Sequence, residues 1–383
     1  MTDRGKIGDG PQDFCCTACG RASPAVNLDY RCRACGGILG FAGPLPYDPA
    51  PQARGGGIER FRVSLPLPPG GGWISLGEGG TPLLPIAVGQ RTVYAKCEYL
   101  NPTGSFKDRG SSVLVSLLAA MGVREAVEDS SGNAGASFAA YAARAGIRAR
   151  IFVPQSASGP KRLQIAAYGA EVVPVPGPRS AAAQAVQEAA VGGVAYASHA
   201  YLPHGLAGYA TAAFEIFEQL GEAPGSVVVP VGQGGLLLGL ALGFESLLAA
   251  GRIARGPRLL GVQARACAPI WAVHAYGAAG LALAREGDTL AEGIRIAQPL
   301  RGDAVLRAVE QSGGSMLAVD EEDILPARDA LGRCGLYVEP TSAVVWAALP
   351  DALASLPDPV VFLLTGSGLK AASTLPANPG VRQ

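Results

Sequence analysis

A lysine stands where a helix is predicted to begin. Residues 101–110 read Asn-Pro-Thr-Gly-Ser-Phe-Lys-Asp-Arg-Gly, and Lys107 shortly precedes the run 111–120 that predicts a helix. The positive end of a helix dipole disfavours a cation, so a neutral amine is favoured there. A neutral lysine amine is a nucleophile toward carbonyl groups. Lys107 is therefore a candidate covalent catalyst, although this string alone would fit a solvated surface lysine equally well.

Two further turns carry polar groups suited to a bound cofactor. Residues 130–133 read Ser-Ser-Gly-Asn and enter a predicted helix, which places the Asn133 amide to bond a ring substituent. Helix capping by Ser131 or Asn133 is the simpler explanation of this turn by itself. Thr365 follows the last predicted strand, and its hydroxyl could either reach a heteroaromatic nitrogen or simply end the strand.

A glycine-rich turn, residues 232–235 (Gly-Gln-Gly-Gly), follows a predicted strand and opens a helix. Consecutive backbone amides without bulky side chains can cradle an anion such as a phosphate at the positive end of a helix. Leu237 stands where the dinucleotide fingerprint has its last glycine, and no acidic partner is evident, which argues against NAD. Tight packing alone would also explain this turn.

The elements that must position these turns alternate along the chain. Strands are predicted at 92–96, 126–129, 149–153, 171–175, 226–231, 258–263 and 360–364, with helices at 111–120, 134–145 and 161–168. Strands that alternate with helices predict an α/β fold, a parallel sheet with helices on both faces. Such sheets bind ligands at the carboxyl ends of their strands, and each turn named above follows a strand.

Two cysteine pairs near the N-terminus have the spacing of a metal site. Cys16 and Cys19 form one pair, Cys32 and Cys35 form the second, and a glycine follows each pair. Four thiolates in two such knuckles can surround a Zn²⁺ ion. A metal would stabilise a module of about 45 residues, which is too small to be stable through its own core. The pairs therefore predict a structural zinc ribbon; disulfides or a metal-free ribbon are the alternatives, and Cys15 could replace Cys16.

Composition narrows the class of protein. Of 383 residues, 49% are hydrophobic and 16% are charged, and the formal net charge is zero. A nucleic-acid partner or an anionic membrane surface would call for a basic excess. No apolar run reaches the roughly 18 residues of a membrane span, and the polar N-terminus does not resemble a secretory signal. We expect a cytoplasmic protein of two to three domains that acts on a small molecule.

Together, in this order and spacing, the four turns resemble those of the fold-type II pyridoxal-phosphate (PLP) enzymes. The threonine synthase branch of that family is the most similar. The resemblance extends from about Leu76 to Lys370, and residues 101–110 are its most specific string. Supporting matches lie at 77–83, 291–295 and 339–343. An N-terminal zinc ribbon accompanies many members of this branch.

The resemblance implies a role for each turn. Lys107 would hold PLP covalently, Asn133 would bond its 3′-oxygen, and Thr365 would face its pyridine nitrogen, where a neutral hydroxyl suits elimination chemistry. The cofactor phosphate would be bound by the backbone amides of Gly232, Gln233, Gly234 and Gly235. The carboxylate and leaving group of the substrate would be lined by Thr103, Ser105, Ser130, Ser131 and Gly132.

The resemblance also implies a domain organisation. The expected fold is that of the tryptophan synthase β-like enzymes, with two three-layer αβα lobes and a small N-terminal zinc ribbon. The ribbon would occupy 1–45, and a Pro/Gly-rich linker with the start of the catalytic body would occupy 46–90. Residues 91–115 and 205–383 would form the large PLP-binding domain, and 116–204 a small mobile domain. A homodimer is expected on the same ground.

Three departures from the branch bear on the substrate. Threonine synthases of this branch usually carry asparagines around the turn 232–235, which is glycine-rich here. Ser367 stands where they commonly have histidine, and Ala134 replaces a threonine that often follows the asparagine. A phosphorylated substrate would need cations near its leaving group, and the candidates are Lys161, Arg162, Arg109 and Arg295. His199 and His204 are expected to cap or pack against the following helix.

The leading hypothesis is a lyase similar to threonine synthase, which converts O-phosphohomoserine and water to threonine and phosphate. A serine/threonine dehydratase or a β-replacement enzyme similar to cysteate synthase is the alternative on the same scaffold. A catalytically inactive zinc-ribbon binding protein is the alternative of another class. The intact Lys107, Asn133 and glycine turn argue against that last hypothesis.

Overall fold

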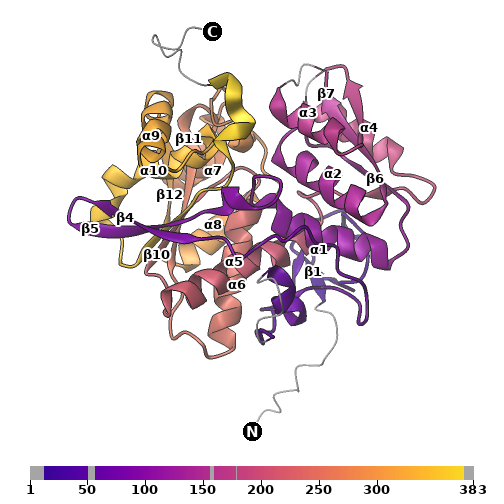
Figure 1. The fold of residues 1–383 in the computed structure, drawn as a ribbon, viewed down its shortest axis with the longest axis horizontal. Coiled ribbons are helices and arrows are strands. Elements are labelled where there is room, and N and C mark those ends of the chain that lie inside the picture. The colour runs from indigo at the N-terminus through magenta and orange to yellow at the C-terminus, as the bar shows by residue number, and fades with distance from the viewer. Residues whose placement is uncertain (1–12, 51–56, 156–158, 178, 375–383) are drawn as a thin grey trace.

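The computed structural model describes residues 13–50, 57–155, 159–177 and 179–374, which contain three sheets (Figure 1). The smallest sheet is N-terminal and antiparallel, with its strands in the order β2-β1-β3. Its strands are β1 (Phe14–Cys16), β2 (Ala22–Ser23) and β3 (Leu39–Phe41). This small sheet forms the predicted N-terminal ribbon.

The largest sheet has six strands in the order β12-β11-β10-β13-β5-β4. They are β4 (Leu83–Val88), β5 (Arg91–Lys96), β10 (Ser226–Pro230), β11 (Arg258–Ala264), β12 (Ser315–Val319) and β13 (Val360–Leu363). The edge strand β4 departs from the expected parallel arrangement, since it pairs antiparallel with β5. Only Gly89 and Gln90 connect the two strands. A parallel crossover needs a dozen or more residues, so this connection permits only a hairpin.

Helices cover both faces of the large sheet, because the apolar residues of its strands point alternately to the two sides. Val227 and Val229 of β10 belong to the core shared with α5 and α6, whereas Val228 belongs to the core shared with α9 and α10. The helices of this lobe are α5 (His204–Leu220), α6 (Gly235–Ala249), α7 (Pro269–Tyr276), α8 (Gly302–Gln311), α9 (Glu321–Arg333) and α10 (Pro340–Ala352).

The second lobe is built on four parallel strands in the order β8-β7-β6-β9. They are β6 (Glu125–Glu128), β7 (Arg148–Pro154), β8 (Glu171–Val175) and β9 (Ala195–Tyr196). Ala126 faces the core of α1, α2 and α3, and Val127 faces the core of α4. Those helices are α1 (Lys107–Ala120), α2 (Asn133–Ala145), α3 (Pro160–Ala167) and α4 (Arg179–Ala189). The expected α/β fold of two three-layer lobes is confirmed.

The predicted strands and helices are present, with shifts of a few residues at their ends. The largest shift concerns α1, which begins at Lys107 and not at 111, and which crosses the proposed domain boundary between 115 and 116. The strands β4, β9 and β12 were not predicted. Two residues, as in β9, are too few to show a periodicity. No helix among the described residues is long and apolar enough to cross a membrane.

The stretch of the expected Pro/Gly-rich linker that the structure describes is closely packed. Phe61, in a 3-10 helix that spans Ile58–Ser64, contacts Phe214 of α5 with ring centroids 5.2 Å apart. The expected domains also include the residues 1–12, 51–56, 156–158, 178 and 375–383, which lie outside the described residues. The domain boundaries and the mobility of the small domain stay predictions.

A buried ionic cluster fixes the start of α1. The Arg109 guanidinium lies 2.7 Å from carboxylate oxygens of both Glu98 and Glu215, and the Lys96 ammonium lies 2.7 Å from Glu215. All four side chains are fully or almost fully buried. Burial alone would raise the pKa of both carboxyl groups, but Arg109 holds each pKa below its usual range. The cluster joins β5, α1 and α5.

We predict that Glu215→Gln lowers the free energy of unfolding by about 3–5 kcal/mol, because it removes a partner from buried charges. The decrease in the free energy of unfolding of Glu215→Gln should be largest near neutral pH. A carboxyl whose pKa is depressed by folding stabilises the protein above its unfolded pKa of about 4.3, and that contribution disappears as the pH falls.

Urea unfolding of Glu215→Gln and Glu218→Gln provides a matched comparison on one helix. Glu218 pairs with Arg60 at a more exposed position, so its substitution should cost only about 0–1 kcal/mol. Equal unfolding midpoints for the two variants would contradict the stabilising role of the cluster.

Candidate active site

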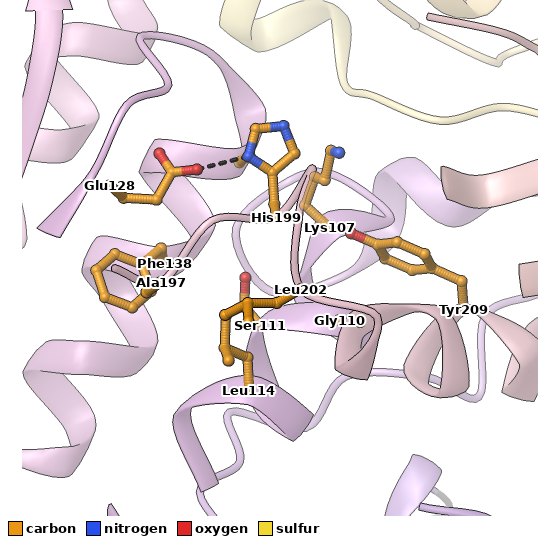
Figure 2. Close-up of a pocket in the computed structure, with 12 residues that line it drawn as sticks. Lys107, Gly110, Ser111, Leu114, Glu128, Phe138, Ala197, His199, Leu202 and Tyr209 are labelled. Atoms are coloured by element: carbon orange, nitrogen blue, oxygen red, sulfur yellow. Dashed lines mark hydrogen bonds and ion pairs between the residues drawn. The ribbon is translucent and has the colours of Figure 1, made fainter. Parts of the chain in front are cut away.

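Lys107 lies at the start of α1 in a pocket between the two lobes (Figure 2). Its Nζ is 4.8 Å from the ring centroid of Phe106 and 5.8 Å from that of Tyr209. Burial lowers the pKa of Lys107 to about 8; Glu128 opposes this effect and Arg179 adds to it. Burial therefore favours the neutral, nucleophilic form of the amine, and the role of Lys107 in cofactor binding stays a prediction.

The loop before α1 is tied to the end of the last strand. The backbone N–H of Phe106 donates to the carbonyl oxygen of Thr365 over 3.0 Å, and Ser105 forms an isolated β-bridge with Gly366. Gly104 has φ +82, and a Cβ there would lie 3.2 Å from Cδ of Lys370. These contacts place Lys107 beside the carboxyl end of β13.

Thr103 is hydrogen-bonded to Asp108 in the first turn of α1. Its backbone N–H and its hydroxyl both donate to the Asp108 carboxylate, over 2.6 and 2.5 Å, and the Ser137 hydroxyl donates to the same group over 2.6 Å. Burial raises the pKa of Asp108 to about 6 despite these bonds. The Thr103 hydroxyl is therefore held by Asp108, and the hydroxyl at 105 is the more available of the two for a ligand.

Asn133 is the first residue of α2, and its side chain crosses to the large lobe. Its Nδ2 donates to Oε1 of Glu339 over 2.8 Å, and the other Glu339 oxygen lies 2.9 Å from Nζ of Lys161. A Cβ on Gly366 would lie only 2.1 Å from Glu339. Helix capping does not explain the Asn133 side chain, since the N-cap residue of α2 is Gly132 and no side chain caps that helix.

Thr365 is buried at the end of β13, where Ser342 of α10 fixes the backbone. The Ser342 Oγ lies 3.0 Å from the Thr365 Oγ1 and accepts the backbone N–H groups of Thr365 and Gly366, over 3.0 and 2.8 Å. The strand end is therefore held by a neighbouring helix, and the Thr365 hydroxyl lies among neutral groups.

Two buried polar atoms of uncharged side chains at this site have no hydrogen-bond partner within the described residues: the Ser105 hydroxyl oxygen and the Asn133 amide oxygen. A buried polar group without a partner costs about 1–3 kcal/mol, so groups of this kind call for an explanation such as a missing ligand. Both atoms belong to residues that the sequence assigned to cofactor or substrate binding.

The turn 232–235 leaves no room for side chains at its buried glycines, Gly232 and Gly234. Gly234 has φ +84, and a Cβ there would lie 2.2 Å from Cγ2 of Val305. The Gln233 side chain is directed elsewhere, because its Oε1 accepts the backbone N–H of Leu300 over 2.9 Å. The turn opens α6, whose first amides have no partner inside the helix. It lies near Lys107, since a Cβ on Gly235 would be 3.5 Å from the ring of Tyr209.

The turn 129–132 follows β6 beside the same pocket. The backbone N–H of Ser130 donates to Glu128 over 2.6 Å, and the N–H of Gly132 donates to the Ser130 hydroxyl over 3.2 Å. Ser131 is partly exposed. Contacts thus join the loop before Lys107 to the end of β13 at Thr365, and Asn133 lies next to Gly366 in the same strand end.

Sequence reasoning missed a Glu–His pair in the pocket wall. Nδ1 of His199 lies 2.5 Å from Oε1 of Glu128, and both residues line the pocket with Lys107. The expectation of a packing role is wrong for His199. It is confirmed for His204, whose Nε2 lies 2.8 Å from the Ala25 carbonyl oxygen and whose ring packs on Phe14. Glu128 could have been recognised as a site residue, because it is a carboxylate near the end of a predicted strand.

Three of the four candidate cations, Arg109, Arg295 and Lys161, differ clearly in their partners. Arg109 belongs to the buried ionic cluster, and Arg295 pairs with Asp288 over 2.7 Å. Lys161 reaches the site through Glu339. Lys370, which was not considered, donates to the carbonyl oxygen of Thr103 over 2.8 Å, and burial lowers its pKa to about 8.

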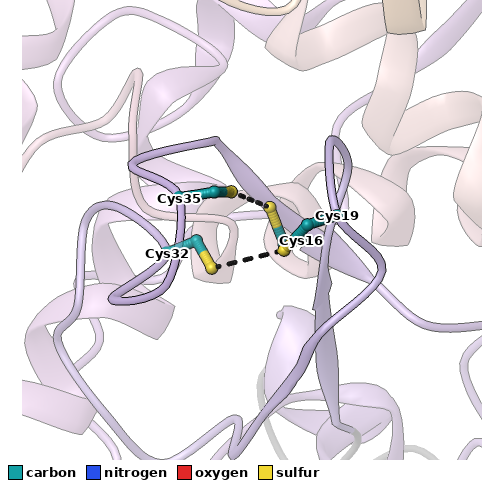
Figure 3. A group of neighbouring side chains, drawn as sticks. All are labelled: Cys16, Cys19, Cys32 and Cys35. Atoms are coloured by element: carbon teal, nitrogen blue, oxygen red, sulfur yellow. Dashed lines mark hydrogen bonds between the residues drawn. The ribbon is translucent and has the colours of Figure 1, made fainter.

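The four expected cysteines converge in the ribbon (Figure 3). Their Sγ atoms all lie within 4.8 Å of one another, with 3.4 Å between Cys16 and Cys35 and 3.8 Å between Cys19 and Cys32. Sulfurs bound tetrahedrally at about 2.3 Å from Zn²⁺ would be about 3.8 Å apart. A backbone hydrogen bond from Cys19 lowers the pKa of Cys16 to about 6. Cys15 lies outside the cluster, with its Sγ 3.9 Å from the Phe41 carbonyl oxygen.

Comparison with known proteins places these features in a family context. The family described as "Pyridoxal-phosphate dependent enzyme" matches residues 74–366. The threonine synthase of Methanocaldococcus jannaschii is 34% identical over 377 residues, which are 93% of this chain and 92% of that protein. The threonine synthase of Mycobacterium tuberculosis is 35% identical over 332 residues, 83% of this chain and 89% of the relative.

Solved structures show a similar fold. A threonine deaminase from T.th. superposes with a TM-score of 0.62 at 28% identity, over 75% of this chain and 92% of that chain. Maize serine racemase has a TM-score of 0.66 at 23% identity, over 76% and 89% of the two chains. The second likeness, at this identity, concerns the fold alone.

The lowered pKa of Lys107 predicts how the cofactor-free protein captures PLP. Only the neutral amine attacks the aldehyde, so the rate of capture should rise with pH and level off above about 8. With a lysine of ordinary pKa, the rate of capture would continue to rise up to a pH of about 10.4. Stopped-flow recording of the visible absorption band across this pH range measures the rate, with Lys107→Arg as the control. A rate that still rises tenfold per pH unit above 9 would contradict the assigned environment.

Proposed function

The chain belongs to the pyridoxal-phosphate dependent enzymes, and we propose that it is a lyase that converts O-phosphohomoserine and water to threonine and phosphate. The observation that carries this proposal is a buried lysine of lowered pKa at the start of α1, directly after a loop whose Phe106 amide bonds the Thr365 carbonyl at the end of β13. The threonine synthase relatives, which match most of the chain, support the choice of reaction.

The described residues fit PLP. The glycine turn offers free backbone amides for its phosphate at the start of α6, where the helix dipole favours an anion. The Asn133 amide, now bound to Glu339, lies next to Gly366 and would serve the ring oxygen. Thr365 would offer a neutral hydroxyl to the ring nitrogen. When bound, PLP supplies a conjugated electron sink for negative charge that develops on the carbon atoms of the substrate.

Lys107 performs two tasks in the proposed reaction. Its neutral amine would hold the cofactor covalently, and once released the same amine would take and return protons at Cα and Cβ of the substrate. Burial keeps its pKa near 8, which leaves the proton transferable at physiological pH. The Ser105 hydroxyl and the turn 130–132 bind and orient the substrate carboxylate.

The phosphate leaving group requires a cation. Lys161 and Lys370 are placed to serve it, because one pairs with Glu339 beside Asn133 and the other donates to the Thr103 carbonyl. Arg109 cannot contribute, since both sides of its guanidinium are engaged by buried carboxylates.

A second candidate, a dehydratase or β-replacement enzyme with an unphosphorylated substrate, is favoured by one observation. The described residues that line the pocket beside Lys107 include the Glu128 carboxylate and no cation other than Lys107. An anionic leaving group would be disfavoured on that side. The similarity to a threonine deaminase is compatible with this candidate.

The decisive assay measures phosphate and threonine after the PLP-loaded protein is incubated with O-phosphohomoserine. We expect the two products in equal amounts, and neither product with Lys107→Ala, which also lacks the visible band. If O-phosphohomoserine stays intact while serine or threonine is converted to its 2-oxo acid, the second candidate replaces the first.

We further propose that Cys16, Cys19, Cys32 and Cys35 bind a structural Zn²⁺ ion. The distances among their sulfurs support this proposal. The metal would also hold part of the pocket wall. The buried Arg301 guanidinium donates to the carbonyl oxygens of Leu39 in the ribbon and of Ala200 and Tyr201 beside His199, over 2.8, 3.1 and 2.7 Å.

We predict that Cys19→Ser loses bound zinc and melts several degrees lower, because a small ribbon depends on its metal for stability. Elemental analysis and a thermal melt measure both effects. Cys334→Ser, which changes an exposed cysteine outside the ribbon, is the control. Full zinc content in Cys19→Ser, or disulfides among these cysteines, would rule out the site.

Other proposals follow from the resemblance. We propose, on the ground of this resemblance, that the small domain, 116–204, moves when substrate enters. The Lys161–Glu339 ion pair joins it to the large lobe. A homodimer and a cytoplasmic location stay predictions, which sedimentation analysis and cell fractionation would test.

A further inference from the structure

Glu128 and His199 reach the pocket from adjacent strand ends. Glu128 is the last residue of β6, and His199 follows β9 by three residues. These strands are parallel neighbours, with Val127 opposite Tyr196. Their carboxyl ends therefore deliver both side chains to the edge of the sheet where Lys107 lies, as Figure 2 shows.

The pair is held in a fixed geometry. Oε1 of Glu128 contacts Nδ1 of His199 at 2.5 Å, and Oε2 accepts the backbone N–H of Ser130 at 2.6 Å. The carboxylate is 1% exposed, whereas the imidazole is 17% exposed. In Figure 2 the second ring nitrogen, Nε2, points away from Glu128 on the side of Lys107. One nitrogen is thus anchored and the other is accessible.

Electrostatics support a neutral imidazole. Burial lowers the pKa of His199 well below its usual value, and Lys107 acts in the same direction. Burial raises the pKa of Glu128 to about 7, which the Ser130 amide, Arg179 and Lys107 oppose. Asp129 also faces the pair. A proton on Nδ1 would bond the two groups and leave Nε2 unprotonated, which is the arrangement of a general base oriented by a carboxylate.

The proposed reaction needs such a base. Lys107 handles the protons on Cα and Cβ, but the water that adds to Cβ must also lose a proton while its oxygen forms the new bond. We propose that His199 is the general base that activates this water, and that Glu128 is the residue that positions His199. This inference rests on the proposed function.

Atoms and electrons balance in this step. The water oxygen forms a bond to the substrate Cβ and breaks one O–H bond, whose proton passes to Nε2. The π bond between Cα and Cβ breaks, and its electron pair moves to Cα, where the conjugation that bound PLP would supply stabilises the charge. The imidazolium then returns its proton to Lys107 or to solvent, so His199 is unchanged after each turnover.

The test compares threonine formed with phosphate released. In His199→Asn, Nδ2 of asparagine can still bond Glu128, but the base is lost. Threonine formation should fall by about 10²-fold or more, while phosphate release falls much less. Substrate that has lost phosphate but gained no water at Cβ would leave as aminocrotonate, which water hydrolyses to 2-oxobutanoate and ammonia. His274→Asn, which changes a histidine bonded to Ser315 outside the pocket, should keep one threonine per phosphate.

A second readout does not depend on turnover. The chain has 3 histidines, so nitrogen-15 NMR of the imidazoles in the PLP-loaded protein can follow each one. We expect His199 to carry its proton on Nδ1 near neutral pH, and Glu128→Gln to change that tautomer or the pKa of the ring.

The outcomes separate the two proposals. If the wild-type protein releases no phosphate from O-phosphohomoserine, the proposed function fails, and the water-activating role fails with it. If the wild-type protein makes threonine and His199→Asn retains one threonine per phosphate, only the inference about His199 is overturned. A protonated Nε2 in the resting protein would also overturn it.

Discussion

The position of Lys107 depends on the salt bridges that Arg109 makes two residues further along the same helix. The guanidinium lies between Glu98 and Glu215, deep inside the protein, and its partners come from the segment after β5 and from α5. Burial of these charges is tolerable only because each has partners. Helix α1 can therefore begin at one place only, and the amine of Lys107 is held at the junction of the two lobes.

Around that junction, burial tunes the chemistry of the site. The same loss of solvation lowers the pKa of Lys107 and raises that of Glu128. A neutral amine and a Glu–His pair that shares a proton can therefore coexist in one pocket at physiological pH. The ribbon also supports the pocket wall, because Arg301 donates hydrogen bonds both to the ribbon and to the segment that follows His199. The protein thus shapes the site mainly by exclusion of water and by backbone contacts.

Much of this could be predicted from the sequence, because local patterns carry it. The alternation of strands and turns predicts the α/β fold, and the turns at Lys107, Asn133 and Thr365 are recognisable from their own residues. The clustering of the four sulfurs could likewise be predicted, because the spacing of the cysteines is a local pattern. What could not be predicted depends on pairings between distant segments. Nothing near Arg109 indicates that Glu215 will enclose it, and β9, which brings His199 beside Glu128, has two residues.

The most direct test of the account is to find where the cofactor attaches. The protein would be loaded with PLP, reduced with borohydride to fix the link to lysine, and digested for mass mapping. The account predicts the modification on the peptide that contains Lys107. A modification on Lys6, Lys96, Lys161 or Lys370, with Lys107 untouched, would contradict it.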